Sequence, residues 1–156
     1  GFIITNGKST YGGGAYVSLH TGIKISGCRF ANNIATLRGG AIYASASDIS
    51  VVNSIFWKNH SDKYGAIIGG ARYTLAMDHC TTYGNTAGSS YGQLITDDSA
   101  PKDILIANSI FYEDDSVNSF RNVHFEYTDL YDSTTSSCPT TCSCGNGMLH
   151  VDPGFA

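Results

Sequence analysis

The sequence predicts an all-β fold, a right-handed parallel β-helix (a solenoid) of about five coils with ~26 residues in each coil. Three observations lead to this prediction. Two short phrases return along the chain at nearly constant intervals. The residues between them alternate in polarity, which is typical of β-strands. The composition, with 18 Gly and only 14% charged residues, suits short strands joined by tight turns.

The first repeated phrase begins with glycine. Glycine at a fixed place in each coil predicts a bend where a Cβ atom would clash or where φ must be positive. The first two intervals between copies are equal, and the third is longer by a single position. The four copies read Gly13-Gly14-Ala15-Tyr16, Gly39-Gly40-Ala41-Ile42, Gly65-Ala66-Ile67-Ile68 and Gly92-Gln93-Leu94-Ile95.

The second phrase carries an aromatic residue and, three positions later, an asparagine. Its copies begin at Phe30, Phe56, Thr82 and Phe111, so the first two intervals are again equal and the last is longer. A turn-rich insertion at residues 97–101 explains the longer last interval. Because stacked strands lie about 4.8 Å apart, the column Asn33, Asn59 and Asn85 predicts an amide ladder at a turn. The fourth copy has Asp114 in this column, so we expect the ladder to fray there.

The alternating residues between the two phrases predict the core. A repeat this short cannot close its own core, so its inward side chains must stack in columns along the axis. The predicted core columns are Ile23, Ile25, Phe30, Ile49, Val51, Phe56, Leu75, Met77, Ile104, Ile106 and Phe111. A further inward column reads Cys28, Ser54, Cys80 and Ser109, and a shortened last coil holds Val123, Phe125 and Leu130. The coils span residues 1–131, and residues 132–156 form a Cys/Ser/Thr-rich C-terminal loop and closing segment of the same domain.

The five cysteines divide into two groups. Cys138, Cys142 and Cys144 lie close together and predict one disulfide of undetermined pairing, which favours an oxidising compartment. A zinc site from these three with His150 is disfavoured, because Cys-x3-Cys-x-Cys is not a usual ligand spacing. Two coil spacings separate Cys28 from Cys80, which is too far for a disulfide. We therefore expect both to be buried free thiols.

No motif predicts catalysis, a cofactor or a metal. The densest acidic cluster is Asp97, Asp98 and Asp103 beside Lys102, and it falls at a turn, where Asp is common for turn chemistry alone. The adjacent pair His79–Cys80 resembles a base and a nucleophile, but neighbouring strand residues face opposite ways. We therefore interpret these groups as structural or solvated.

One N-glycosylation sequon is present, Asn59-His60-Ser61. Asn59 also belongs to the predicted amide ladder, and an amide in a ladder is not freely exposed. The two interpretations conflict, and the sequence leaves both open.

The charge and hydropathy patterns exclude some partners. The net charge is −4 with no run of Lys or Arg, so nucleic-acid binding is not expected. No apolar run approaches the ~20 residues of a membrane-spanning helix. The chain opens with Gly1-Phe2-Ile3-Ile4, without an initiator Met or a capping element, so it reads as an excerpt or a mature fragment. An uncapped first coil predicts end-to-end stacking.

The Gly-Gly-Ala-Ile and Phe-x-x-Asn phrases resemble the repeats of polymorphic outer-membrane proteins, autotransporter-type surface adhesins. The opening phrase at residues 2–7 and the closing Asp152-Pro153-Gly154-Phe155 also resemble secreted right-handed β-helix repeat proteins. The resemblance covers residues 1–131 and 151–155. It implies the solenoid fold and a place outside the cell, whereas activity does not follow from a β-helix fold.

Two functions remain as expectations. The first is a non-enzymatic extracellular structural or adhesive β-helix, a repeating subunit of a surface fibre that associates with itself or with other surface proteins and glycans. The alternative is a polysaccharide-binding or polysaccharide-degrading module of the lyase or hydrolase type. Outward aromatics such as Tyr16, Trp57 and Tyr112 would then serve as sugar platforms.

Overall fold

The computed structural model describes residues 1–88, 94–97, 103–113, 123–132 and 143–147. These residues form a parallel β-solenoid of about four turns, each of ~26 residues, and none of them is helical. The sequence predicts about five coils. Beyond residue 97 the described strands belong to only two of the four sheets, so the last coils are incomplete in the described part of the chain.

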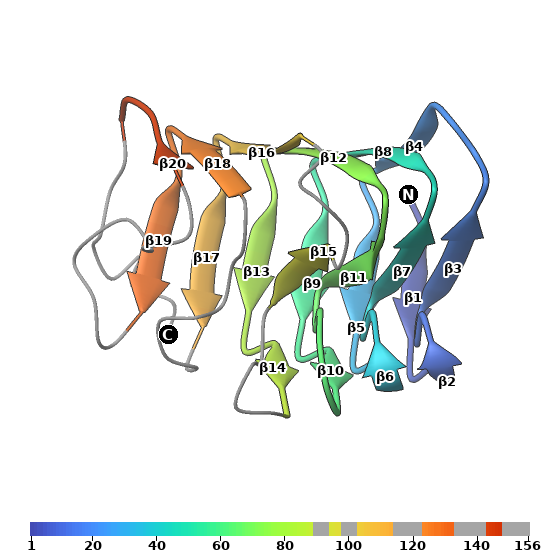
Figure 1. Ribbon diagram of the computed structural model, residues 1–156. Coiled ribbons are helices and arrows are strands. Elements are labelled where there is room, and N and C mark those ends of the chain that lie inside the picture. Colours follow the sequence, from blue (N-terminus) through green and yellow to red (C-terminus); the bar gives the residue numbers. More distant parts are fainter. Residues whose placement is uncertain (89–93, 98–102, 114–122, 133–142, 148–156) are drawn as a thin grey trace.

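Four parallel sheets run along the solenoid (Figure 1). Sheet A contains β1 (Ile3–Thr5), β5 (Arg29–Ala31), β9 (Ile55–Trp57), β13 (Thr81–Tyr83), β17 (Ile110–Glu113) and β19 (Asp129–Asp132). Sheet B contains β2 (Lys8–Tyr11), β6 (Ile34–Arg38), β10 (His60–Ser61) and β14 (Thr86–Ala87). Sheet C contains β3 (Ala15–Ser18), β7 (Ile42–Ser45), β11 (Ile68–Ala71) and β15 (Ile95–Asp97). Sheet D contains β4 (Ile23–Ser26), β8 (Asp48–Val52), β12 (Thr74–Asp78), β16 (Ile104–Ala107), β18 (Val123–Glu126) and β20 (Ser143–Cys144).

Each full turn visits the sheets in the order A, B, C, D and then returns to sheet A one coil further along. In Figure 1 the first coil, β1 to β4, lies at the right, and β19 and β20 lie at the left. Within the predicted C-terminal segment, Ser143 and Cys144 form β20, which pairs with β18 and extends sheet D.

A residue with positive φ stands at every described corner between sheets, which turns the chain sharply without a long loop. Glycine adopts this conformation freely, whereas other residues adopt it at a steric cost. The sets are Asn6, Asn32, Lys58 and Gly84 between sheets A and B; Gly12, Gly39 and Gly65 between B and C; Leu19, Ala46 and Arg72 between C and D; and Gly27, Asn53, His79, Asn108 and Tyr127 between D and A.

The glycine phrase marks the corner between sheets B and C, as its composition predicts. Its first copy is displaced by one position from the predicted alignment, because Tyr16 pairs with Tyr43 rather than with Ile42. The extra residue lies in β6, where the three-residue step from Ala35 to Arg38 faces the two-residue step from Ser9 to Tyr11 in β2. The structural repeat at this corner therefore runs from Gly12 to Gly39, and not from Gly13 to Gly39 as the phrase alone predicts.

The predicted inward columns form the core. Nine of the eleven predicted core residues are buried, and Phe30 stacks on Phe56 with ring centres 5.2 Å apart. The exceptions, Ile23 and Ile25, are only half-buried, as is Cys28. All three belong to the first described coil, which packs against a neighbouring coil on one side alone. The buried set comprises Phe30, Ile49, Val51, Phe56, Leu75, Met77, Ile104, Ile106 and Phe111.

The amide ladder lies inside the corner between sheets A and B, and its members are fully buried. The Nδ2 of Asn33 donates to Oδ1 of Asn59 at 2.9 Å, and the Nδ2 of Asn59 donates to Oδ1 of Asn85 at 2.9 Å. Each Oδ1 also accepts the backbone N–H of the ladder residue before it. Each Nδ2 donates its second hydrogen to a carbonyl one coil earlier, as Asn59 does to Phe30. The side chain thus bonds both neighbouring coils.

The ladder ends on Glu113 and not on Asp114, which lies outside the described residues. β17 continues as a strand through Glu113, so the chain does not turn where the earlier coils do. The buried Glu113 carboxylate accepts the backbone N–H of Asn85 at 2.6 Å and its Nδ2 at 2.9 Å. A carboxylate can accept both bonds but cannot donate one onward, so the amide-to-amide chain stops there.

Thr82 interrupts the aromatic core column. It pairs with Phe56 on one side and Phe111 on the other, and it is fully buried. Its hydroxyl has no hydrogen-bond partner. A buried unsatisfied hydroxyl costs free energy, so this position is a weak point of the core.

The ladder predicts a large loss of stability in Asn59→Ala. The substitution removes an amide that makes hydrogen bonds to Asn33, Phe30 and Asn85, and it leaves buried donors and acceptors without partners. We expect the free energy of unfolding to fall by about 3 kcal/mol or more. Ser50→Ala, on the outer face of sheet D, should change it by less than about 0.5 kcal/mol. Urea unfolding of both variants checks this. Equal, small effects would contradict a structural ladder.

Candidate functional site

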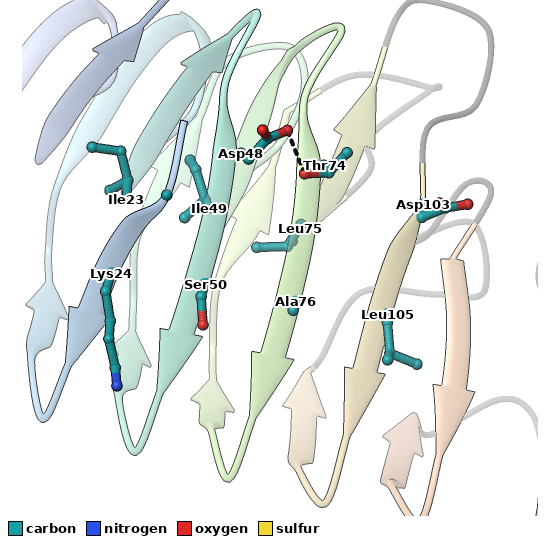
Figure 2. Close-up of a pocket in the computed structure, with 11 residues that line it drawn as sticks. Ile23, Lys24, Asp48, Ile49, Ser50, Thr74, Leu75, Ala76, Asp103 and Leu105 are labelled. Carbon is teal, nitrogen blue, oxygen red and sulfur yellow. Dashed lines mark hydrogen bonds between the residues drawn. The ribbon is translucent and has the colours of Figure 1, made fainter. Parts of the chain in front are cut away.

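A shallow groove crosses the outer face of sheet D (Figure 2). Its volume is about 580 Å³, and it runs from β4 to β16 across successive coils. The short side chains of Ser50 and Ala76 form its middle, and Lys24 and Leu105 stand at its two ends. The groove therefore lies parallel to the solenoid axis, where an extended ligand would cross the strands.

One side of the groove carries a polar column. Thr74 pairs with Asp48, and its hydroxyl donates to Oδ1 of Asp48 at 2.8 Å. Asp103 precedes β16 and lies one coil further on, with an exposed side chain. Because Leu75 pairs with Ile104, Asp103 lies next to Thr74 in the following coil. Asp48, Thr74 and Asp103 therefore form one column, with the threonine between the two carboxylates.

The two carboxylates of this column are widely separated along the axis. Two coil spacings, about 9.6 Å, separate Asp48 from Asp103 along the axis, at the upper end of what an inverting glycosidase uses. The Asp48 carboxylate is already bonded to Thr74. The Asp103 side chain is exposed. The groove offers hydrogen-bond acceptors and a hydroxyl to a ligand, without a described acid and base pair.

The acidic turn predicted at residues 97–103 is only partly described. Asp103 lies at the groove, Asp97 ends β15, and Asp98 and Lys102 lie outside the described residues. His150 and the first predicted C-terminal cysteines, Cys138 and Cys142, also lie outside them. In the described ranges, no three His, Cys, Asp or Glu side chains gather closely enough to hold a metal ion.

Two histidine clusters were missed by the sequence analysis. His124 Nδ1 lies 2.7 Å from the Ser143 hydroxyl, and its Nε2 lies 3.2 Å from Oε1 of Glu126. His60 repeats the pattern with Thr86 at 2.7 Å and Asp62 at 3.1 Å. The available signal is the spacing His-x-acid, since residues two apart in extended backbone share a face.

In each cluster a hydroxyl, an imidazole and a carboxylate contact one another in the sequence found in a catalytic triad. Both clusters are nevertheless cross-strand pairs on the open surface. Each hydroxyl is the register partner of its histidine. The nearby N–H of Gly145 donates to Phe125 and is not available to stabilise an oxyanion. The two clusters lie on different sheets, B and D, as expected for cross-strand pairing on the surface of a solenoid.

His79 and Cys80 do not form a catalytic pair. His79 stands at a corner with a φ of 51°, and its Nδ1 lies 2.9 Å from Asp78. The hydrogen bond from Asn108 is the main cause that lowers the pKa of Asp78, and the contact with His79 adds to it. The Cys80 side chain is buried in the core, and this burial raises the pKa of its thiol. A neutral buried thiol is a poor nucleophile.

The cysteines agree in part with the predictions. Cys28 and Cys80 are free thiols, but only Cys80 is buried. Cys144 lies in β20 beside Phe125. A disulfide within the C-terminal cluster stays a prediction, because Cys138 and Cys142 are not among the described residues.

The sequon at Asn59 is structurally unfavourable for glycosylation. The Asn59 amide nitrogen, the atom that would carry the glycan, is buried and donates to Phe30 and to Asn85. Modification would therefore require the corner to open. In the folded solenoid the geometry favours the ladder interpretation of Asn59.

The fold defines the chain as a parallel β-solenoid. No protein-family model, no curated protein and no solved structure matches it. A membrane-spanning helix is not found in the described segments, all of which are strands and turns.

The environment of the two free thiols predicts different reactivity. At pH 8, a thiol reagent should modify the half-buried Cys28 in the folded protein, whereas Cys80 should react only on unfolding. Burial also raises the pKa of the Cys80 thiol above the value of about 9 expected in the unfolded chain. The contribution of this thiol to the free energy of unfolding is therefore complete below about pH 9 and is lost as the pH rises further. Peptide mapping after timed labelling checks the order, and denatured protein is the control. Equal labelling of both thiols in the folded state would contradict the burial.

Proposed function

We propose that this chain is a non-enzymatic, extracellular structural or adhesive β-solenoid that assembles end to end with copies of itself. The observation that carries the proposal is the open face of the first described coil. Among the described strands, β1, β2, β3 and β4 are each the outermost of their sheet, so one edge of each is open to a further coil. Unpaired parallel edges invite pairing with another chain.

The first coil is also apolar on this side. Its inward residues are only partly buried, and Phe2 and Leu19 are 77% and 80% exposed. Apolar surface that one more coil would bury favours association. The partly buried inward set comprises Ile4, Ala15, Val17, Ile23 and Ile25.

A second copy of the chain is the partner that fits this face. Its coils have the same spacing and the same four parallel sheets, so a head-to-tail contact would continue each sheet. Such a contact does not close on itself and builds a filament. Gly7 occupies the ladder column in the first coil, where its backbone N–H donates to Asn33 Oδ1, and it has no side-chain amide. The contact at this corner would therefore rest on backbone and apolar groups.

The repeated phrases support the location outside the cell, because they resemble those of polymorphic outer-membrane proteins. A disulfide among Cys138, Cys142 and Cys144 would agree with an oxidising environment. Self-association, other surface proteins and glycans are the partners that we propose.

The axial groove on sheet D favours a second candidate, a polysaccharide-binding or polysaccharide-degrading module. Its length along the axis and its hydroxyl and carboxylate groups suit an extended sugar chain. The absence of an acid and base pair among the described groove residues makes binding the stronger form of this alternative.

Sedimentation velocity tests the assembly. We expect the purified chain to grow in mass with concentration and to form linear particles in electron microscopy. The double variant Phe2→Lys/Leu19→Lys adds charge to the first coil and should raise the concentration needed by about tenfold or more. A matched control, Ile55→Lys/Leu105→Lys, changes exposed apolar residues in the middle of the solenoid and should have no such effect. A wild-type chain that stays monomeric at high concentration would refute the proposal.

A further inference from the structure

Two cationic side chains converge on the only tryptophan of the chain. The Arg29 guanidinium carbon lies 4.5 Å from the centre of the Trp57 ring, and the Lys58 Nζ lies 5.2 Å from it. Arg29 begins β5 and pairs with Ile55, whereas Trp57 pairs with Ala31. Arg29 and Trp57 are therefore diagonal neighbours on the outer face of sheet A, and Lys58 stands at the adjoining corner.

Neither cation has an acidic partner among the described residues. In the part of the chain that the structure describes, the ion pairs are made by other residues. The Nε of Arg29 is buried without a hydrogen-bond partner. Contact with the indole offsets part of the cost of desolvating a guanidinium, but a ring supplies no acceptor for its N–H groups. The described residues therefore supply this cluster with an aromatic ring and no carboxylate.

The same face continues as an aromatic column along the solenoid axis. Trp57, Tyr83 and Tyr112 occupy one register position in three successive coils, and all three are half-buried. The rings of Tyr83 and Tyr112 stack with centres 5.3 Å apart at 18°. Because the stacked faces cover each other, the column presents ring edges and phenol groups to the outside at the coil spacing of about 4.8 Å.

We propose that Arg29, Lys58 and Trp57 bind the carboxylate or sulfate group of an acidic glycan. The two cations pair with the anionic group, and the sugar chain extends over the aromatic column next to them. A nucleic acid fits less well, since stacked rings leave no open face for a base and the chain carries a net charge of −4. The site lies away from the groove on sheet D and does not depend on end-to-end assembly.

Trp57 fluorescence reports on this site alone, because the chain has no other tryptophan. We would titrate the protein at low salt with oligogalacturonate, a heparin-type sulfated oligosaccharide, neutral dextran and sodium sulfate. Saturable changes are expected with one or both acidic oligosaccharides, and they should weaken as salt is added. Dextran should produce none, and sodium sulfate should bind more weakly than the oligosaccharides.

Single variants then identify the residues. Arg29→Gln and Lys58→Asn should each weaken binding of the acidic oligosaccharide by about tenfold, because each removes a charged partner. Asn is chosen at position 58 because it tolerates the φ of 51° found there. Lys24→Gln removes a charge from one end of the groove on sheet D and tests that rival site. Lys8→Gln removes the same charge from an exposed position on sheet B, outside both sites, and should leave affinity unchanged. Thermal unfolding shows whether each variant is folded.

Four results would overturn the proposal. Unchanged affinity in both Arg29→Gln and Lys58→Asn would show that these two cations do not bind the acidic glycan. A loss with Lys24→Gln alone would place the glycan in the groove on sheet D. Sulfate binding as tightly as the oligosaccharides, or a single-stranded oligonucleotide binding more tightly than either, would refute the glycan as the ligand.

Discussion

The solenoid depends on one buried interaction, the amide ladder at the corner between sheets A and B. Stacked coils of short strands meet mainly through backbone bonds and apolar contacts, which specify spacing but little else. A side chain that bonds the coil before it and the coil after it fixes register along the axis. Asn59 does both, since it accepts from Asn33 and donates to Asn85. Asparagine suits this role because its amide both donates and accepts.

The other corners follow from the same constraint. Once each coil must return to one register position, the chain has to turn within a few residues at four places. A positive φ achieves this at every described corner, with Gly39 and Gly65 at little cost and Ala46 or Leu19 at some steric cost. The outer faces are then aligned in columns, and surface groups from distant parts of the sequence become neighbours. The groove on sheet D and the cationic cluster around Trp57 both arise in this way.

The repeat period made the core columns of the solenoid predictable from the sequence. The column of Phe30, Phe56, Thr82 and Phe111 follows directly from the nearly constant interval between copies of the second phrase. Local irregularities did not follow. An extra residue in β6 opposite β2 displaced the first glycine phrase by one position, and the straight end of β17 placed Glu113 where Asp114 was expected. The repeat period gives the register partners of each residue, but it does not predict contacts between diagonal neighbours, such as that of Arg29 with Trp57.

Hydrogen exchange of the asparagine side chains tests the central claim most directly. In an NMR experiment on the folded protein, the Nδ2 protons of Asn33, Asn59 and Asn85 should exchange only as the whole solenoid unfolds. The Nδ2 protons of the exposed Asn53, at a corner outside the ladder, should exchange at the rate of an unprotected side-chain amide. Exchange of the three ladder amides as fast as that of Asn53, under conditions where the backbone of sheet A stays protected, would contradict the account.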